Sequence, residues 1–140
     1  MSASITHIGF SDESNWNTGR FRSLGLVTVP YYCLAYIENE LRQTLKESDI
    51  KEFKWKRLNG ARERFAAQKM CKFAIENACS GRLRVDVLVW DIQDNRHKIA
   101  RRDDIANLER MYYHLFRNVL RARWPNSAVW KLNQIGRAHV

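Results

Sequence analysis

Segments with a strand pattern alternate with segments with a helical pattern, and this alternation constrains the fold most. Strands are predicted at residues 5–10, 23–29, 50–55 and 83–90 and from 127 onward, and helices at 31–47, 61–79 and from Asp103 or Asp104 to about 123. Alternation of this kind is typical of an α/β sheet with helices packed on its faces. A chain of 140 residues is long enough for one such domain.

The helical segments also predict which side chains are buried. On the helix at 61–79, the inward face is expected to hold Phe65, Ala66, Met70, Phe73 and Ala74. On the helix that ends near 123, it is expected to hold Ile105, Leu108, Tyr112, Leu115, Phe116, Val119 and Leu120. Cys71 and Cys79 are interpreted as small core residues.

The composition excludes several classes of protein. No apolar run approaches the roughly 20 residues of a membrane helix, and residues 1–7 do not have the pattern of a secretory signal. The three cysteines are an odd number without a CxxC pair, which disfavours a disulfide framework. We therefore expect a reduced, cytoplasmic compartment and no membrane partner. The oligomeric state is not indicated by the sequence.

The chain carries a strong positive charge. It has 24 Lys and Arg residues against 15 Asp and Glu, a formal net charge of +9. Arginines outnumber lysines 16 to 8, and the planar guanidinium group suits phosphate recognition. The balance favours a polyanionic partner, above all nucleic acid. A basic domain without such a partner remains an alternative.

The last six residues, Ile135–Val140, coincide with the translation of a widely used sequencing adapter. We expect residues 135–140 to be a non-native tail. The natural sequence would then depart from this one after Asn133 or Gln134, and a natural C-terminal segment would be missing. The domain proper is accordingly assigned to residues 1–134.

Two acidic positions follow predicted strands. Asp12 and Glu13 come after residues 5–10, and Asp91 comes after residues 83–90. If these two strands lie side by side and parallel, Asp12 and Asp91 meet at one edge of the sheet. Crowded carboxylates there would need a divalent ion such as Mg²⁺ or Mn²⁺. Glu52 is the candidate third carboxylate, with Asp94 in reserve. Alternatively, these acids only cap turns.

Four segments resemble the domain of unknown function 3800 family. They are Gly9-Phe10-Ser11-Asp12-Glu13-Ser14, residues 23–29, Glu52-Phe53-Lys54-Trp55 and Val87-Leu88-Val89-Trp90-Asp91, and the resemblance extends over residues 5 to 132. It implies a ribonuclease H-like mixed sheet with helices packed on its faces, here incomplete at the C-terminus. It also implies a divalent-metal site in which Asp12, Glu13 and Asp91 are ligands and Glu52 joins them. The Gln-x-x-Asp element that ends family members is absent.

Basic and aromatic side chains near these acids are candidates for binding nucleic acid. Arg96, Lys98, Arg101 and Arg102 form a dense basic group after Asp91, suited to clamping phosphates. Trp16 follows the first acidic turn and is a candidate for stacking on a base. The alternatives are a solvated loop for the basic group and a hairpin cover for Trp16. His97 is interpreted as a metal ligand, a proton carrier or a solvated loop residue.

These observations favour a metal-dependent nuclease domain. Metal-bound water would attack a phosphodiester, Asp12 and Asp91 would hold Mg²⁺ or Mn²⁺, and Glu52 would complete the site. A fragment that lacks a ligand would be inactive even if the full-length protein cleaves. The alternative is a non-catalytic module of the same fold that binds nucleic acid or another partner. The two hypotheses differ in whether the carboxylates of Asp12 and Asp91 converge.

Overall fold

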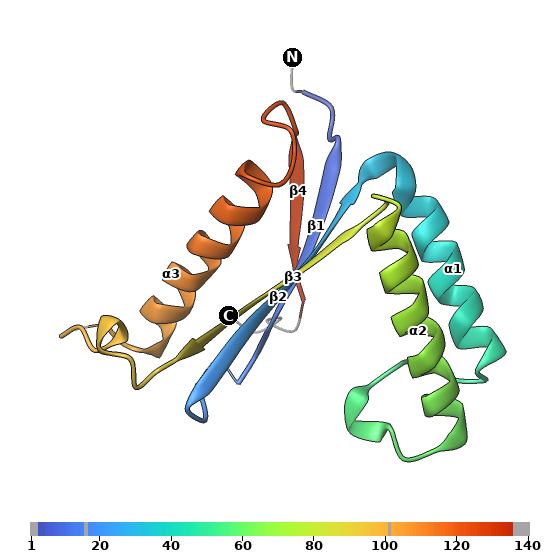
Figure 1. The fold of residues 1–140 in the computed structure, drawn as a ribbon, viewed down its shortest axis with the longest axis horizontal. Helices are drawn as coiled ribbons and strands as arrows, with labels where there is room; N and C mark the ends of the chain where they lie inside the picture. Colours follow the sequence, from blue (N-terminus) through green and yellow to red (C-terminus); the bar gives the residue numbers. More distant parts are fainter. Residues whose placement is uncertain (1–2, 16, 101, 136–140) are drawn as a thin grey trace. The chain divides into compact units, whose positions relative to one another are not determined.

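A computed structural model describes residues 3–15, 17–100 and 102–135. The chain divides into two compact units, one formed by residues 1–28 with 85–140 and the other by residues 29–84. The first unit contains most of the sheet and one helix, and the second contains a pair of helices (Figure 1). Each unit is described by itself. The prediction of a single domain therefore remains a prediction.

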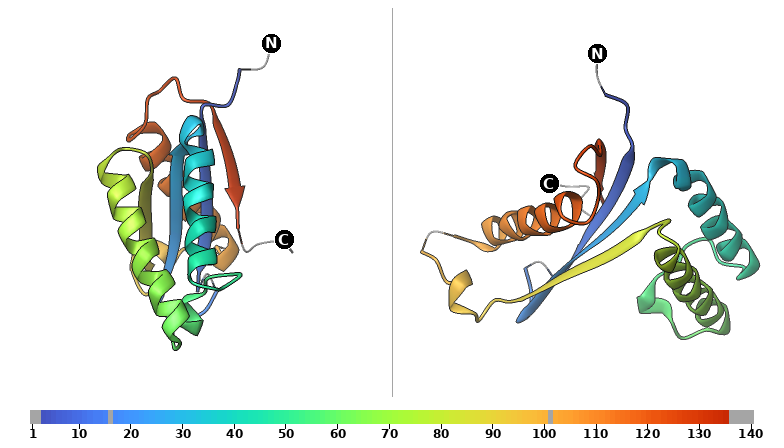
Figure 2. Two further views of the ribbon diagram at one scale, coloured as in Figure 1. Left: turned by 90° about the vertical axis from the view of Figure 1, so that its right-hand side faces the viewer. Right: turned by 45° about the horizontal axis from the view of Figure 1, so that its top comes forward.

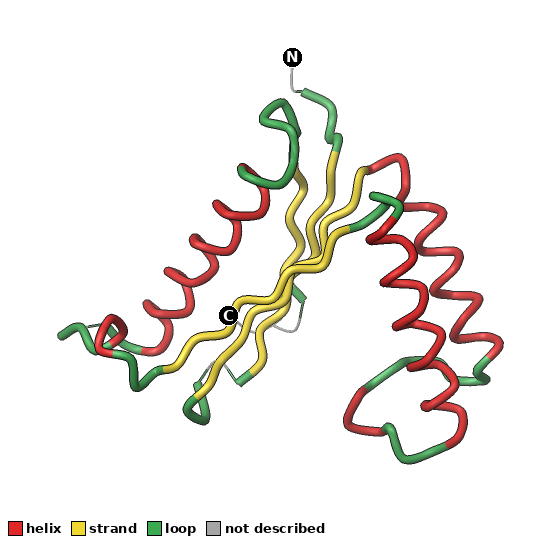
Figure 3. The backbone as a smooth tube through the Cα atoms, viewed as in Figure 1, coloured by secondary structure: helices red, strands yellow, loops and turns green. Residues whose placement is uncertain are grey.

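Four strands form one mixed sheet in the order β3-β2-β1-β4. Their bounds are His7–Ser14 for β1, Phe21–Pro30 for β2, Arg84–Asp91 for β3 and Trp130–Gln134 for β4. β1 and β4 are parallel, with His7 beside Trp130 and Ser11 beside Gln134. β1 and β2 form a hairpin and run in opposite directions (Figure 3). The coarse prediction of an α/β protein is confirmed.

Helix α3, Asp104–Phe116, covers one face of this sheet and ends in a π-helical turn, Arg117–Arg121. The side chain of Asp103 accepts a hydrogen bond from the N–H of Ala106, which satisfies a free donor of the first turn. Side chains from β2, β3, α3 and the π-helical turn form the core: Leu24, Leu26, Trp90, Leu108, Met111, Tyr112, Leu115 and Val119. Alternation along the strands and helical spacing along α3 bring these residues together.

The opposite face of β3 is open. Trp90 is buried under α3, and since neighbouring strand residues point to opposite faces, Val85, Val87 and Val89 point away from α3. These three valines are 50%, 64% and 58% exposed. The regular alternation predicted for this strand is therefore present, with one buried side and one exposed side.

The second unit is a helical hairpin. A 3₁₀ turn, Tyr31–Cys33, leads into α1, Leu34–Glu47, and α2 spans Ala61–Cys79. The two helices lie side by side (Figure 2). Lys69 of α2 forms an ion pair with Glu47 of α1, and the guanidinium of Arg82 lies 5.3 Å from the ring centroid of Tyr36. The predicted bounds of α2 are confirmed.

The prediction of a strand at residues 50–55 is wrong. The chain bends at Lys51 and Glu52, and a short 3₁₀ helix spans Trp55–Arg57. Phe53 packs locally against Trp55, with ring centroids 5.2 Å apart, and Trp55 remains 63% exposed. The segment thus pairs with no strand, and its aromatic residues contact each other.

The first strand is longer than predicted, because Ser11–Ser14 extend it. Asp12 and Glu13 therefore lie within β1 and do not follow it. Several predicted core side chains are exposed: Phe65 and Ile105 at 43% and 45%, and both Cys71 and Cys79. All three cysteines are free, in agreement with the prediction of no disulfide framework.

We predict that Leu108→Ala destabilises the first unit by about 2–5 kcal/mol, because Leu108 is fully buried and its truncation leaves a cavity. Urea unfolding followed by circular dichroism measures the change. Ile105→Ala, in the same helix but at an exposed position, is the matched control and should cost less than about 1 kcal/mol. Equal losses in the two variants would contradict the assigned core.

Candidate functional site

The sheet does not bring Asp12 and Asp91 together. Strand β2 lies between β1 and β3, so the expectation that these two strands are neighbours is wrong. The parallel neighbour of β1 is β4. Because adjacent strands are about 4.8 Å apart, two strand spacings separate the backbones of β1 and β3 by roughly 10 Å.

The two aspartates also lie at different heights along the sheet. The backbone of Asp12 lies beside Gly25 of β2, whereas the N–H of Ile92, the residue after Asp91, donates to the carbonyl oxygen of Arg20 at 3.0 Å. About four residues of extended chain, or roughly 13 Å, therefore separate the two along the sheet, so a single pair of ions about 4 Å apart does not reach both carboxylates.

Asp91 is neutralised by an arginine. The Nε of Arg20 donates to both carboxylate oxygens at 3.1 Å, and its Nη2 donates to Oδ2 at 2.8 Å. The N–H of Gln93 donates to Oδ1 at 2.9 Å. The Arg20 hydrogen bonds, then that of Gln93, hold the pKa of Asp91 below its ordinary value. The pKa of Arg20 is raised by the same contact. This ion pair links the residue before β2 to the last residue of β3.

Glu13 faces α3, where the hydroxyl of Tyr112 donates to its carboxylate. Burial, and then the contact with Glu13, raise the pKa of Tyr112 above its ordinary value. Because neighbouring residues of a strand alternate in direction, Asp12 points to the other face of the sheet. The adjacent acids of the Asp-Glu-Ser sequence therefore point to opposite faces.

The remaining acids have local partners. Glu52 belongs to the second unit, where its carboxylate lies 3.3 Å from Nζ of Lys54 and its side chain is 64% exposed. Asp94 accepts from the backbone N–H and the guanidinium of Arg96, and these bonds hold its pKa well below the ordinary value. Among the described residues, no group of three or more His, Cys, Asp or Glu side chains is placed to hold a metal ion. The predicted ligands do not by themselves fit a divalent cation.

The strand that lies next to Asp12 on the side away from β2 is β4. The N–H of Ile135 donates to the carbonyl oxygen of Ser11 at 2.7 Å, which continues the register in which Ser11 lies beside Gln134. One further residue along this register brings Ile135 next to Asp12 and on the same face. The side chain that accompanies Asp12 in this chain is thus apolar.

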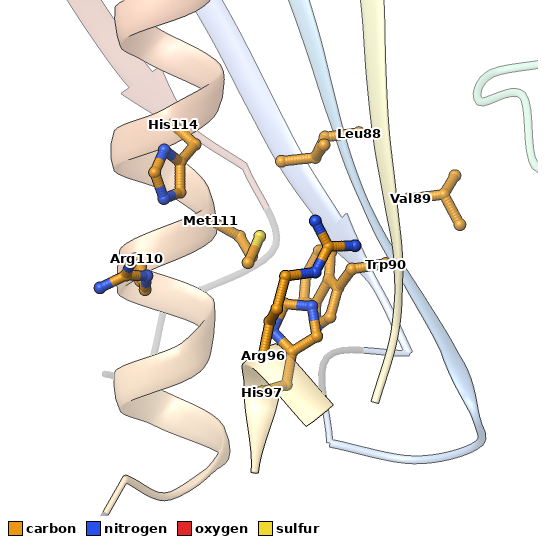
Figure 4. A pocket seen from close by; sticks show the side chains of 8 residues that line it. All are labelled: Leu88, Val89, Trp90, Arg96, His97, Arg110, Met111 and His114. Carbon is orange, nitrogen blue, oxygen red and sulfur yellow. The ribbon is translucent and has the colours of Figure 1, made fainter. Parts of the chain in front are cut away.

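Basic side chains gather between β3 and α3. A short 3₁₀ helix, η3 (Asn95–His97), follows β3 and carries Arg96 and His97. Together with α3 it borders a pocket of about 410 Å³ (Figure 4), and the lining residues are Leu88, Val89, Trp90, Arg96, His97, Arg110, Met111 and His114. We call this space the β3–α3 pocket. It has two arginines and two histidines at its border and apolar side chains from the core behind them.

The loop that borders the pocket is held by specific contacts. Arg96 forms an ion pair of 2.7 Å with Asp94, and Nη2 of Arg102 donates to the carbonyl oxygen of Arg96 at 2.7 Å. Lys98 is exposed beside them. Of the predicted nucleic-acid contacts, Arg96, Lys98 and Arg102 thus lie in one loop. Trp16 and Arg101 lie outside the described residues.

Two buried polar atoms of the pocket lining lack a hydrogen-bond partner within the described ranges. They are the indole Nε1 of Trp90 and Nδ1 of His97. Both atoms have almost no solvent-accessible surface, so a ligand reaches either of them only if neighbouring side chains move. Sequence reasoning missed Arg110 and His114, although their i,i+4 spacing on one helix was the available signal.

Comparison with known proteins gives two relatives. The chain is 41% identical over 134 residues to "Uncharacterized protein ORF2'" of Methanothermobacter thermautotrophicus, and 40% identical over 134 residues to "Uncharacterized protein ORF2" of the same organism. Each match covers 90% of this chain and 47% of the relative. The chain thus spans about half the length of the curated relatives it matches. No family model matches, and no solved structure matches.

None of the described helices is both long enough and apolar enough to traverse a bilayer.

We predict that Arg20→Gln raises the pKa of Asp91 toward its ordinary value of 3.8, because it removes the main cause of the depression. The Arg20 contact stabilises the fold above that ordinary value, and this contribution is lost as the pH falls through the lowered folded pKa. Carboxyl ¹³C NMR titration measures the shift. Arg123→Gln, an equal charge change elsewhere, should leave the pKa of Asp91 in place, and an unchanged pKa in Arg20→Gln would contradict the ion pair.

Proposed function

We propose that this chain is a nucleic-acid-binding module that contacts the phosphate backbone through the border of the β3–α3 pocket. The observation that carries this proposal is that Arg96 and His97 of η3 and Arg110 and His114 of α3 line one pocket. The formal net charge of +9 supports the same partner.

The chemistry of the border suits phosphate. A guanidinium group offers paired donors to phosphate oxygens, and lysine adds a point charge. Arg110 and Lys98 are both exposed, so both charges are accessible to a polyanion. Release of counterions from the nucleic acid would then drive binding.

The proposal also includes the type of fold. The mixed sheet, in which β1 is parallel to β4 and α3 packs on one face, supports a ribonuclease H-like domain. Binding requires no metal, which agrees with the separation of Asp12 from Asp91.

Arg110→Gln is predicted to weaken binding of single-stranded oligonucleotides and to reduce the salt dependence. Removal of one phosphate contact lowers the magnitude of the slope of log K against log salt by about 0.7. Fluorescence anisotropy at several salt concentrations measures both quantities. Arg123→Gln removes the same charge from an exposed position outside the pocket lining and should change the slope less. Equal effects of the two variants would contradict a localised contact.

A second candidate function is metal-dependent cleavage of phosphodiesters by longer proteins of this type. One observation favours it: Asp12 lies beside the end of a parallel strand, where a carboxylate at position 135 would be its neighbour. Carboxylate oxygens are the ligands that Mg²⁺ and Mn²⁺ prefer. In this chain the position is Ile135, so the present residues do not supply the pair.

Ile135→Asp is predicted to create a Mn²⁺ site with Asp12, because the two carboxylates would then lie on adjacent strands and on one face. Electron paramagnetic resonance of free Mn²⁺ measures the affinity, which should exceed that of the unchanged chain by about tenfold or more. Ile135→Asn is the matched control, and adding Asp12→Asn should abolish the gain. An Ile135→Asp variant that binds Mn²⁺ no better than the unchanged chain would remove this candidate.

A further inference from the structure

The β3–α3 pocket is larger than a phosphate contact requires, and it has apolar walls. Behind its basic border lie the apolar side chains of Leu88 and Met111 and the indole of Trp90. A volume of about 410 Å³ is large for a phosphate group alone, and phosphate makes no use of apolar walls. The occupant must therefore combine an anionic part with a flat or apolar part.

The lining also contains planar rings, because Trp90, His97 and His114 all border the pocket. The edge of a nucleobase offers acceptors and donors on a ring that packs against apolar walls.

We propose that the β3–α3 pocket takes one unstacked nucleotide of a single-stranded nucleic acid, with its base inside and its phosphate at Arg96 and Arg110. This inference rests on the proposed function and specifies its ligand. Side chains from β3 and α3 meet there, as Figure 4 shows for Leu88 and Trp90 of β3 and Met111 of α3. Duplexes, whose bases are stacked and paired, present no such group without unstacking.

The pocket lies on the α3 face of the sheet. Asp12 and Asp91 point to the other face, since Glu13 and Trp90 beside them face α3. The nucleotide site is therefore distinct from the strand edge that carries Asp12. The two places are separable by experiment.

The test compares two strands with the same number of phosphates, an oligothymidylate and its fully abasic analogue. The oligothymidylate should bind about tenfold more tightly by fluorescence anisotropy, because burying one base adds to the phosphate contacts. Uridine monophosphate should likewise bind more tightly than ribose 5-phosphate, with inorganic phosphate the weakest probe.

Two variants of α3 locate the effect. His114→Trp enlarges a side chain of the lining and should reduce the preference for the base-bearing strand over the abasic strand to about one. Tyr113→Trp is the matched control at the neighbouring, 59% exposed position and should keep the preference. If His114→Trp does not fold, photo-crosslinking of 5-iodouracil strands decides, with the expected adduct on the peptide that contains Trp90 and His97.

Each outcome has one meaning. Equal binding of the oligothymidylate and the abasic strand would overturn the nucleotide pocket and leave the phosphate-binding function standing. Absence of binding to either strand at low salt would overturn the proposed function itself. Crosslinks confined to other segments, or a preference that His114→Trp does not alter, would also overturn the nucleotide pocket.

Discussion

The packing of α3 against β2 and β3 is the interaction on which the rest of the first unit depends. Leu24 and Leu26 of the sheet and Leu108 of the helix are essentially inaccessible to solvent, and burial of this apolar surface is the main stabilising contribution. The same packing fixes both functional regions. It sets α3 beside η3 to form the β3–α3 pocket, and it brings Tyr112 to Glu13.

Three carboxylates in and beside the sheet are stabilised by local hydrogen-bond donors. Asp91 is paired with Arg20, Asp94 with Arg96, and Glu13 accepts from Tyr112. Each of these three carboxylates thus has a donor within hydrogen-bond reach, and no cation shared among the three is needed to relieve repulsion. Lys98 of the loop after β3 and Arg110 of α3 are exposed cations, which is why we assign binding there and not at the acids.

Local sequence patterns were sufficient to predict most of the helices and strands, but they were insufficient to predict which side chains the fold brings together. The helix at Ala61–Cys79 and the strand at Arg84–Asp91 follow from the spacing of apolar residues and from the residues that end each segment. The order β3-β2-β1-β4 depends on pairing between distant segments, which no single segment encodes, and it decided that Asp12 and Asp91 are apart. The pairing of Arg20 with Asp91 and the approach of Arg110 and His114 to η3 have the same non-local origin. Residues 50–55 show the converse, because a β-prone composition without a neighbouring strand formed no strand.

One measurement tests this account most directly: ¹H–¹⁵N NMR mapping of a short oligothymidylate titrated into the labelled chain at low salt. The account predicts chemical-shift changes concentrated at residues 88–90, 96–98 and 110–114, with the amides of Asp12 and Ser14 unchanged. Shifts centred on Asp12 and the end of β4, with the residues around the β3–α3 pocket unaffected, would contradict it.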